Sequence, residues 1–341
     1  MFELNKITRN NIEKLKAYSS ARDEFTGASG VFLDANENPY GKLNRYPDPY
    51  QKELKSEINK CTGIDPNNIF IGNGSDEIID LLFRVFCNPS IDKALTFAPT
   101  YGMYDVSAGI NDIELIKVPL NDEFDIDFNS VQGFLSDPQL KLILICSPNN
   151  PTGNCPSFTA IESIIENFGG VVLIDEAYIN FSTKKSFADL IDKYPNLIVS
   201  QTMSKAWGLA AARIGMAFGN SSIIDLFNKV KPPYNISGLN QNAAIESLKK
   251  QDEFLANKEQ ILQNKAKLNK ELNNLDCITK VYPSDTNFFL IECLDAEKIY
   301  NALINKKIII RNRNNVIKNC IRITVGTADE NQLLIEELKS I

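Results

Sequence analysis

Short apolar segments alternate with amphipathic stretches along most of the chain. The apolar segments have the length of buried strands, and the stretches between them carry apolar residues at helical spacing. Strands are predicted at 68–71, 94–97, 142–146, 171–174, 197–200 and 214–218. This alternation is typical of an α/β domain in which helices flank a mostly parallel central sheet.

The pattern changes from about residue 245 onwards. A charged helical stretch to residue 275 is followed by apolar segments at 288–291, 308–310 and 321–325, which predicts a smaller α+β domain. The first forty or so residues show no sustained period and predict an arm lying across the rest. We therefore expect an arm with part of the small domain at 1–45, a large domain at 46–245 and a small domain at 246–341.

Composition and charge restrict the possible partners. A chain of 341 residues is longer than one hydrophobic core usually supports, which agrees with two domains. Its formal net charge of −7 and the lack of a basic stretch argue against nucleic-acid binding. No apolar window is long enough to span a membrane, so we expect a soluble protein whose partners are small molecules or a second copy of the chain.

The chain contains no histidine, which excludes imidazole acid-base catalysis, Ser-His-Asp and Cys-His nucleophiles and histidine-ligated metals. The seven scattered cysteines never occur as C-x-x-C and predict reduced, mostly buried thiols in a cytoplasmic protein. No metal site is expected. Another group must therefore move protons.

Several predicted strands end in polar or glycine residues, and in open α/β sheets ligands bind beyond the carboxyl ends of the strands. The first such end is GNGSDE (72–77), where Ser75 or Asp76 can cap the following helix. Free amides at a helix N-terminus suit a phosphate. An ordinary capped helix start remains the alternative.

Two further strand ends carry polar side chains in defined places. The loop SPNNPTG (147–153) contains two prolines and can hold one of its paired asparagine side chains rigidly, although it can also be a plain turn. Asp175 directly follows four apolar residues, and its burial is costly unless a cation meets it. Tyr178 can reach the same region. A solvated strand end is the alternative.

The segment TMSKAWG (202–208) places Lys205 in an apolar loop, with Arg213 just before the next strand. Desolvation can lower the pKa of such a lysine and make its amine a nucleophile, although most lysines are solvated surface residues. Taken together, these strand ends supply the parts of a pyridoxal-phosphate site. Lysine would hold the aldehyde as an imine and carry protons, aspartate would keep the pyridinium protonated, and a cationic cup would bind the phosphate.

The segments LDANENPYG, NRYPDP, GNGSDE, PTYGMY, SPNNPTG, VVLIDEAY, TMSKAWGLAAARIG and CIRITVGT resemble those of fold-type I pyridoxal-phosphate aminotransferases over nearly the whole chain. The resemblance implies that Lys205 binds the cofactor covalently and Asp175 pairs with the pyridinium nitrogen. It implies that Asn150 and Tyr178 contact the ring hydroxyl and that Tyr101 stacks on the ring. The implied phosphate ligands are Ser75, Asp76, Thr202, Ser204 and Arg213. The resemblance also implies a homodimer in which Tyr46 reaches the cofactor phosphate of the neighbouring subunit.

The same segments are most similar to those family members that exchange an amino group between histidinol phosphate and 2-oxoglutarate. This likeness implies that Arg322 and Arg311 recognise the substrate anion, with Tyr18 and Asn36 nearby. The connection 311–322 is about two residues shorter than the commoner family pattern, and Arg313 lies close by. Either Arg311 or Arg313 can therefore take the anion, and a structural salt bridge of Arg322 is the alternative to binding.

Other functions fit part of the pattern. An aromatic aminotransferase or a threonine-phosphate decarboxylase would share the cofactor residues and differ at the substrate end. A catalytically idle regulatory domain that senses the cofactor would usually carry a DNA-binding module. No basic helix-turn-helix region precedes residue 36, which favours an enzyme.

Overall fold

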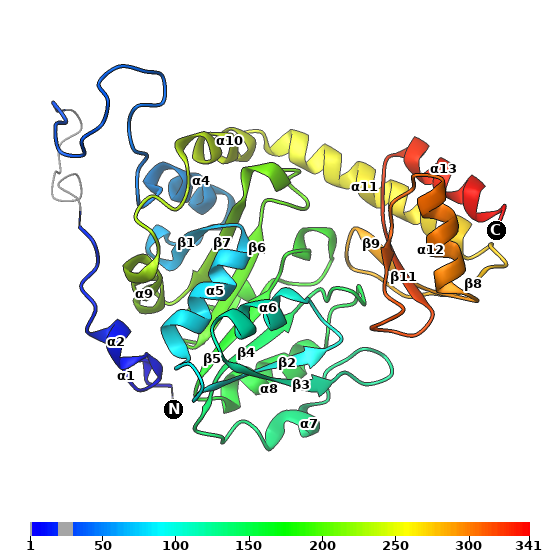
Figure 1. Ribbon diagram of the computed structural model, residues 1–341, viewed down its shortest axis with the longest axis horizontal. Coiled ribbons are helices and arrows are strands. Elements are labelled where there is room, and N and C mark those ends of the chain that lie inside the picture. The colour runs from blue at the N-terminus through cyan, green and yellow to red at the C-terminus, as the bar shows by residue number, and fades with distance from the viewer. Residues whose placement is uncertain (1, 20–29) are drawn as a thin grey trace.

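The structure is a computed structural model that describes residues 2–19 and 30–341. Its central sheet has the strand order β1-β7-β6-β5-β4-β2-β3 (Figure 1). The strands are β1 (Ile69–Asn73), β2 (Lys93–Ala98), β3 (Glu114–Pro119), β4 (Leu140–Cys146), β5 (Val171–Asp175), β6 (Leu197–Thr202) and β7 (Ile214–Gly219). Strands β2 to β6 pair in parallel, and β7 runs antiparallel to β1 and β6. The predicted mostly parallel sheet is confirmed.

Helices cover both faces of this sheet, which explains why its central strands are apolar throughout. One apolar core lies under α4 (Lys52–Thr62), α7 (Phe128–Gln132), α8 (Phe158–Asn167) and α10 (Gly238–Leu248). The other lies under α5 (Ser75–Phe86), α6 (Met103–Ile110) and α9 (Ser221–Val230). Short 3-10 turns occupy Pro66–Asn68, Ile179–Phe181, Phe187–Leu190 and Ala210–Ala212. None of the helices in the described ranges has the length and apolar character needed to cross a membrane.

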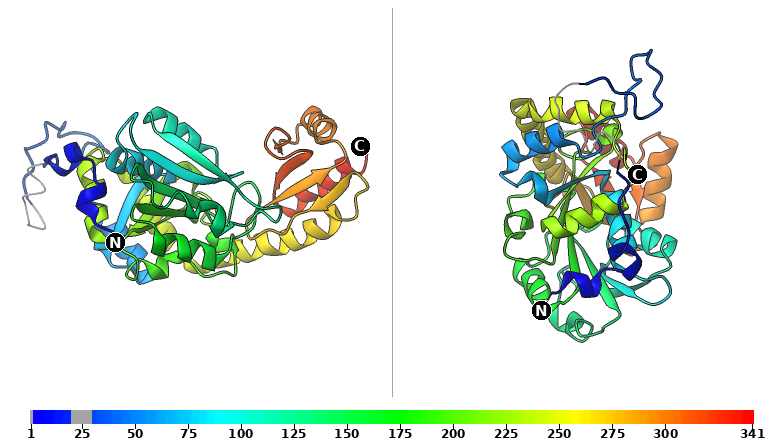
Figure 2. Two further views of the ribbon diagram at one scale, coloured as in Figure 1. Left: turned by 90° about the horizontal axis from the view of Figure 1, so that it is seen from below. Right: turned by 90° about the vertical axis from the view of Figure 1, so that its left-hand side faces the viewer.

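A second, antiparallel sheet has the order β10-β11-β9-β8. Its strands are β8 (Ile278–Val281), β9 (Phe288–Cys293), β10 (Arg311–Asn312) and β11 (Cys320–Thr324). One face packs against α11 (Gln251–Leu272), α12 (Ala296–Asn305) and α13 (Ala328–Leu338). Because side chains alternate along a strand, Arg322 and Phe288 lie on the other face. Figure 2 shows α11 running from the large α/β body to this smaller unit.

Some elements differ from the sequence prediction. Strands β3 and β8 are largely exposed or half-buried and have no continuous apolar run, so they were not predicted. The segment 308–310 is not a strand, because β10 begins at Arg311. The helical stretch predicted to residue 275 is two helices, α10 and α11, with a break at 249–250. Finally, neither Ser75 nor Asp76 caps α5, because Gly74 is the N-cap residue and makes no side-chain cap.

The described part of the N-terminal arm lies at the end of the molecule opposite the small sheet (Figure 1). Helices α1 (Leu4–Ile7) and α2 (Asn10–Glu13) dock beside α5, where the Arg9 amide donates to the Val85 carbonyl at 3.0 Å. Residues 30–46 contain no helix or strand. The described part of the arm, residues 2–19 and 30–46, therefore lies at the edge of the large body and does not cross it. The domain limits at 45/46 and 245/246 stay a prediction.

Candidate active site

One pocket lies at the carboxyl ends of the parallel strands, as the sheet topology requires. Its polar side chains come from the ends of several strands, so residues far apart in sequence meet there. It is lined by Ser75, Asp76, Tyr101, Cys146, Asn150, Asp175, Ala177, Tyr178, Thr202, Ser204, Lys205, Ala210 and Arg213. The structure therefore brings together every residue that we predict to bind the cofactor, with the exception of Tyr46.

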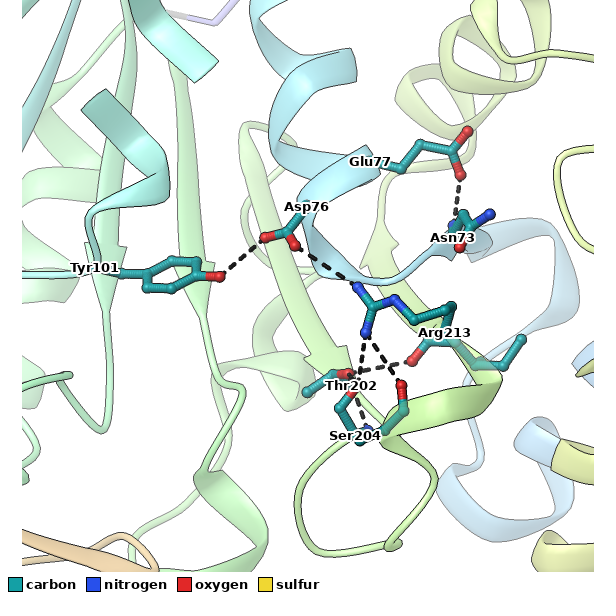
Figure 3. Close-up of polar contacts among 9 residues, drawn as sticks. Asn73, Asp76, Glu77, Tyr101, Thr202, Ser204 and Arg213 are labelled. Carbon is teal, nitrogen blue, oxygen red and sulfur yellow. Dashed lines mark hydrogen bonds and ion pairs between the residues drawn. The ribbon is translucent and has the colours of Figure 1, made fainter. Parts of the chain in front are cut away.

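Arg213 and the first residues of α5 line one side of the pocket, where α5 begins. Figure 3 shows Arg213 reaching towards Asp76 and Ser204, with its Nη2 3.7 Å from the Asp76 carboxylate and its Nη1 donating to the Ser204 hydroxyl at 3.4 Å. Gly74 has a φ of +78°, and a Cβ at this position would collide with the Arg213 guanidinium. Because Gly74 has no side chain, the Arg213 guanidinium can lie close to the first backbone amides of α5. Such an arrangement suits a phosphate group.

Asp175 ends β5 and is fully buried at the floor of the pocket. Its carboxylate accepts hydrogen bonds from the Tyr104 hydroxyl at 3.0 Å, the Ser200 hydroxyl at 3.3 Å and the Ala177 amide at 3.2 Å. Burial raises the pKa of Asp175 above its usual value, and these donors oppose the shift. No described basic side chain forms an ion pair with it. A protonated ring nitrogen of pyridoxal phosphate would supply the missing charge, so the chemistry of Asp175 fits this cofactor.

Lys205 follows β6 and lies beside Tyr178, with its Nζ 5.5 Å from the centre of the phenol ring. Burial lowers the pKa of the amine, and the positive charge of Arg322 lowers it further, while Asp175 opposes the shift. A larger fraction of neutral amine makes Lys205 a better nucleophile. This electrostatic setting agrees with the expectation from the sequence.

The loop that contains Asn150 is fixed by the side chain of Asn149, which bonds within the loop and to the segment after β2. The side chain of Asn149 donates to the Pro99 carbonyl at 2.9 Å and to the Thr152 hydroxyl at 2.8 Å, and it accepts from the Thr100 hydroxyl at 2.8 Å. Because Asn149 is satisfied by these contacts, its neighbour Asn150 can point into the pocket. There the amide oxygen of Asn150 accepts from Nη1 of Arg322 at 2.5 Å.

The small sheet supplies the cationic side of the site. Arg322 on β11 packs over the Phe288 ring, with its guanidinium carbon 5.1 Å from the ring centre. Phe288 in turn meets Tyr178 edge to face at 5.1 Å between ring centres. Arg311 lies directly opposite Arg322 in the ladder of β10 and β11. Two of the predicted substrate arginines thus share one face, next to the pocket.

Three predicted residues lie elsewhere. Tyr46 and Asn36 line a separate surface pocket with Leu239, and Tyr46 stacks on Tyr234 with ring centres 4.4 Å apart. Tyr18 is 67% exposed and lies in the described arm. None of the three lines the pocket of its own chain. Their roles remain predictions.

The structure also shows contributors that the sequence reasoning missed. Tyr104 is completely buried, supports Asp175, and lies edge to face with Tyr101 at 5.7 Å. Tyr101 precedes α6, whereas Tyr104 lies within it, so the spacing of the two tyrosines carries no helical signal. Asp285 had no signal either.

Asp285 joins the small domain to the loop beside the pocket. Its amide donates to the Gly153 carbonyl at 2.7 Å, and its carboxylate accepts from the Ser182 hydroxyl at 3.1 Å and from the Cys155 amide at 3.4 Å. Asp285 and Cys155 are 130 positions apart in the chain, so their contact joins two loops that are distant in sequence. The contacts of Asp285 hold the loop of Asn150 against the unit that carries Arg322.

A partly buried lysine, a buried strand-end carboxylate and an arginine beside a helix N-terminus meet at one sheet edge. This arrangement is typical of enzymes that use pyridoxal phosphate, and the family comparison agrees with it. The model of the family "Aminotransferase class I and II" matches residues 28–338. The chain belongs to this family, and pyridoxal phosphate is its cofactor.

Individual relatives place the chain more narrowly. Histidinol-phosphate aminotransferase of Bacteroides thetaiotaomicron is 49% identical over 343 residues, and that of Cytophaga hutchinsonii is 47% identical over 349 residues, with 99% of each chain covered in both comparisons. The crystal structure of histidinol-phosphate aminotransferase from Clostridium acetobutylicum has a TM-score of 0.80 at 25% identity and covers 87% of this chain and 90% of that one. Within its family, the chain groups with the histidinol-phosphate aminotransferases. The predicted fold class is confirmed.

Proposed function

We propose that the enzyme transfers the amino group of L-histidinol phosphate to 2-oxoglutarate, giving imidazole-acetol phosphate and L-glutamate in histidine biosynthesis. The observation that carries this proposal is the position of Arg322, a partly buried guanidinium beside the Lys205 pocket. Full-length similarity to named histidinol-phosphate aminotransferases supports it. The two half-reactions follow each other at this one site in a ping-pong order.

Pyridoxal phosphate, when bound, supplies an electron sink for the charge that develops on the carbon bearing the amino group. Arg213, Ser204, Thr202 and the first residues of α5 would hold its phosphate. Asp175 would keep the proton on its ring nitrogen, and Asn150 with Tyr178 would contact its ring hydroxyl. Tyr101 would lie on the face of the cofactor ring. In the structure its hydroxyl donates to the Asp76 carboxylate at 3.1 Å.

Lys205 would also act as the acid and base of the reaction. A proton must leave the substrate carbon and return at a neighbouring atom, and the chain has no histidine to move it. Burial lowers the pKa of Lys205, which raises the share of neutral amine that can accept that proton. Arg322 would orient the substrate by its distal anion, with the phosphate and a carboxylate taking the same place in the two half-reactions.

Replacement of Arg322 tests the substrate assignment. Histidinol phosphate has no carboxylate, so its phosphate is the only strong anion by which the enzyme can orient it. We expect Arg322→Ala to lower kcat/KM for this substrate by about ten- to a hundredfold or more, because charge-assisted hydrogen bonds are lost. Lysine should restore the rate only in part, since it cannot offer two parallel donors. Stopped-flow spectra of each half-reaction measure the effect.

A panel of amines provides the control for this prediction. Wild-type enzyme should prefer histidinol phosphate to histidinol by about the same factor, and Arg322→Ala should remove most of that preference and slow the glutamate half-reaction. Persistence of the phosphate preference in Arg322→Ala would contradict the assignment. So would a wild-type preference for phenylalanine or tyrosine, which would leave only the broader aminotransferase activity.

We also propose a homodimer in which Tyr46 completes the site of the partner subunit. Tyr46 lies outside the pocket of its own chain and is 49% exposed. Large apolar side chains of the neighbouring segment are exposed as well, namely Val31, Leu33, Tyr40 and Leu43. An apolar surface of this kind favours contact with another protein surface.

Free, partly buried cysteines further support a cytoplasmic location.

Subunit mixing tests this shared site. Tyr46→Phe should weaken cofactor retention by about 1 kcal/mol, the usual net contribution of one hydrogen bond, or somewhat more because phosphate is charged. A mixture of the inactive variants Tyr46→Ala and Lys205→Ala should regain activity on subunit exchange, because one site of each heterodimer has both residues. Each variant mixed with itself is the control. A mixture that stays inactive, although mass spectrometry shows heterodimers, would disprove sharing.

A further inference from the structure

Three arginines gather on one face of the small sheet. Arg311 and Arg322 are directly opposite each other in the antiparallel ladder of β10 and β11. The ladder continues past β10, because the Arg313 amide donates to the Cys320 carbonyl at 2.9 Å. Residues two apart on an extended strand face the same side, so Arg313 joins Arg311 and Arg322.

No described acidic residue neutralises this cluster. Within residues 2–19 and 30–341, no ion pair joins Arg311, Arg313 or Arg322 to a carboxylate. The Nε atoms of Arg313 and Arg322 are buried and have no hydrogen-bond partner. Like charges opposite each other destabilise a strand pair, and an unpaired buried donor is costly. An anion bound among these side chains removes both costs.

The cluster is close enough to the pocket to act on its contents. The positive charges of Arg313 and Arg322 both lower the pKa of Tyr178, although burial raises it more. For Arg313 itself, burial first and then the charges of Arg322 and Arg311 lower the pKa to about 10, and Tyr178 opposes this. Arg313 is half-buried, whereas Arg311 is exposed. Arg313 is therefore the more enclosed of the two candidates on the 311–313 segment.

We propose that Arg313 is a third substrate-binding cation, which makes the site select a doubly charged phosphate over a singly charged carboxylate. This inference rests on the proposed function. A phosphate monoester carries close to two negative charges at neutral pH and has three acceptor oxygens, so it can use a third guanidinium. A carboxylate has one charge and two oxygens, which Arg322 alone can satisfy in a bidentate contact. The register of the 311–313 segment against β11 places Arg313 on the face that carries Arg322.

The two half-reactions separate these two anions experimentally. In holoenzyme, Arg313→Ala should lower kcat/KM for the L-histidinol phosphate half-reaction by about ten- to a hundredfold, the value of one charge-assisted contact. The L-glutamate half-reaction should change less than about threefold. Arg313→Lys should fall between wild type and Arg313→Ala with the phosphate substrate, because it keeps the charge and loses the fork.

Binding without turnover gives a second measurement. In the Lys205→Ala background, the dissociation constant of L-histidinol phosphate should rise by a similar factor when Arg313 is also replaced, while that of L-histidinol should not. Asn312→Ala is the matched control, because Asn312 lies on the opposite face and its amide donates to Glu297 at 2.8 Å. It should alter neither constant.

Each outcome decides the inference. An equal loss in both half-reactions, or no loss with the phosphate substrate, overturns the role of Arg313 while the wild-type phosphate preference upholds the proposed function. A wild-type enzyme that does not distinguish histidinol phosphate from histidinol overturns both. A selective loss with the phosphate substrate, in a variant that melts at the wild-type temperature, supports the inference.

Discussion

Lys205→Ala should abolish transamination while leaving the fold intact. The substitution removes the amine that we expect to attach the cofactor and to carry the proton, and the chain has no histidine that could take over the proton transfer. Lys205 is only partly buried, and its loss leaves no unpaired charge in the core. Turnover of histidinol phosphate should fall below detection, whereas the melting temperature of the apoprotein should change little.

Borohydride reduction locates the reactive lysine independently of turnover. Wild-type holoenzyme should carry a visible chromophore that reduction fixes irreversibly onto Lys205, as peptide mass spectrometry shows. Lys265 provides a matched control, because burial also lowers its pKa but its amine donates to the Ser284 carbonyl at 2.6 Å, outside the pocket. Lys265→Ala should keep the label on Lys205. A reduced adduct at any other lysine would refute the site.

Asp175→Asn should slow proton abstraction from the substrate by about a hundredfold or more, the usual order for losing a charged group that stabilises a transition state. An amide is neutral and cannot hold the ring nitrogen of the cofactor in its protonated form. Cofactor should still bind through the cup around Arg213. Single-turnover kinetics with an α-deuterated amine measures the step, and an unchanged rate would show that Asp175 is only structural.

Asp175→Asn should stabilise the apoprotein, although it slows the reaction of the holoenzyme. Burial raises the pKa of Asp175 in the folded state, so the unfolded chain loses this proton at a lower pH than the folded chain. The ionised carboxylate therefore destabilises the fold at pH values above the unfolded pKa. Apo Asp175→Asn should melt higher than apo wild type near pH 7, and the gain should shrink towards pH 4. Added cofactor should reverse the order, which a melting curve with and without it can test.

The sequence by itself determined most of the large sheet and the edge of the sheet at which the candidate site lies. Strands such as β4 and β5 are buried on both faces, so their continuous apolar runs could be identified without a structure. Parallel strands place their carboxyl ends at one edge, and this rule predicts that Asn150, Asp175 and Lys205 meet. Local pattern and sheet topology are enough for both. Where burial is partial, as in β3, the apolar run is broken and the strand was missed.

Only the tertiary structure decided how the site is supported and completed. The contact of Tyr104 with Asp175 and the bridge from Asp285 to Gly153 join segments whose separation in sequence carries no local signal. The face on which Arg313 lies depends on strand register, and a shift of one residue would turn it away. The periodicity of apolar residues indicates which face of a segment is buried and which is exposed to solvent. It does not report which distant segment a polar side chain meets, because that depends on the packing of the whole chain.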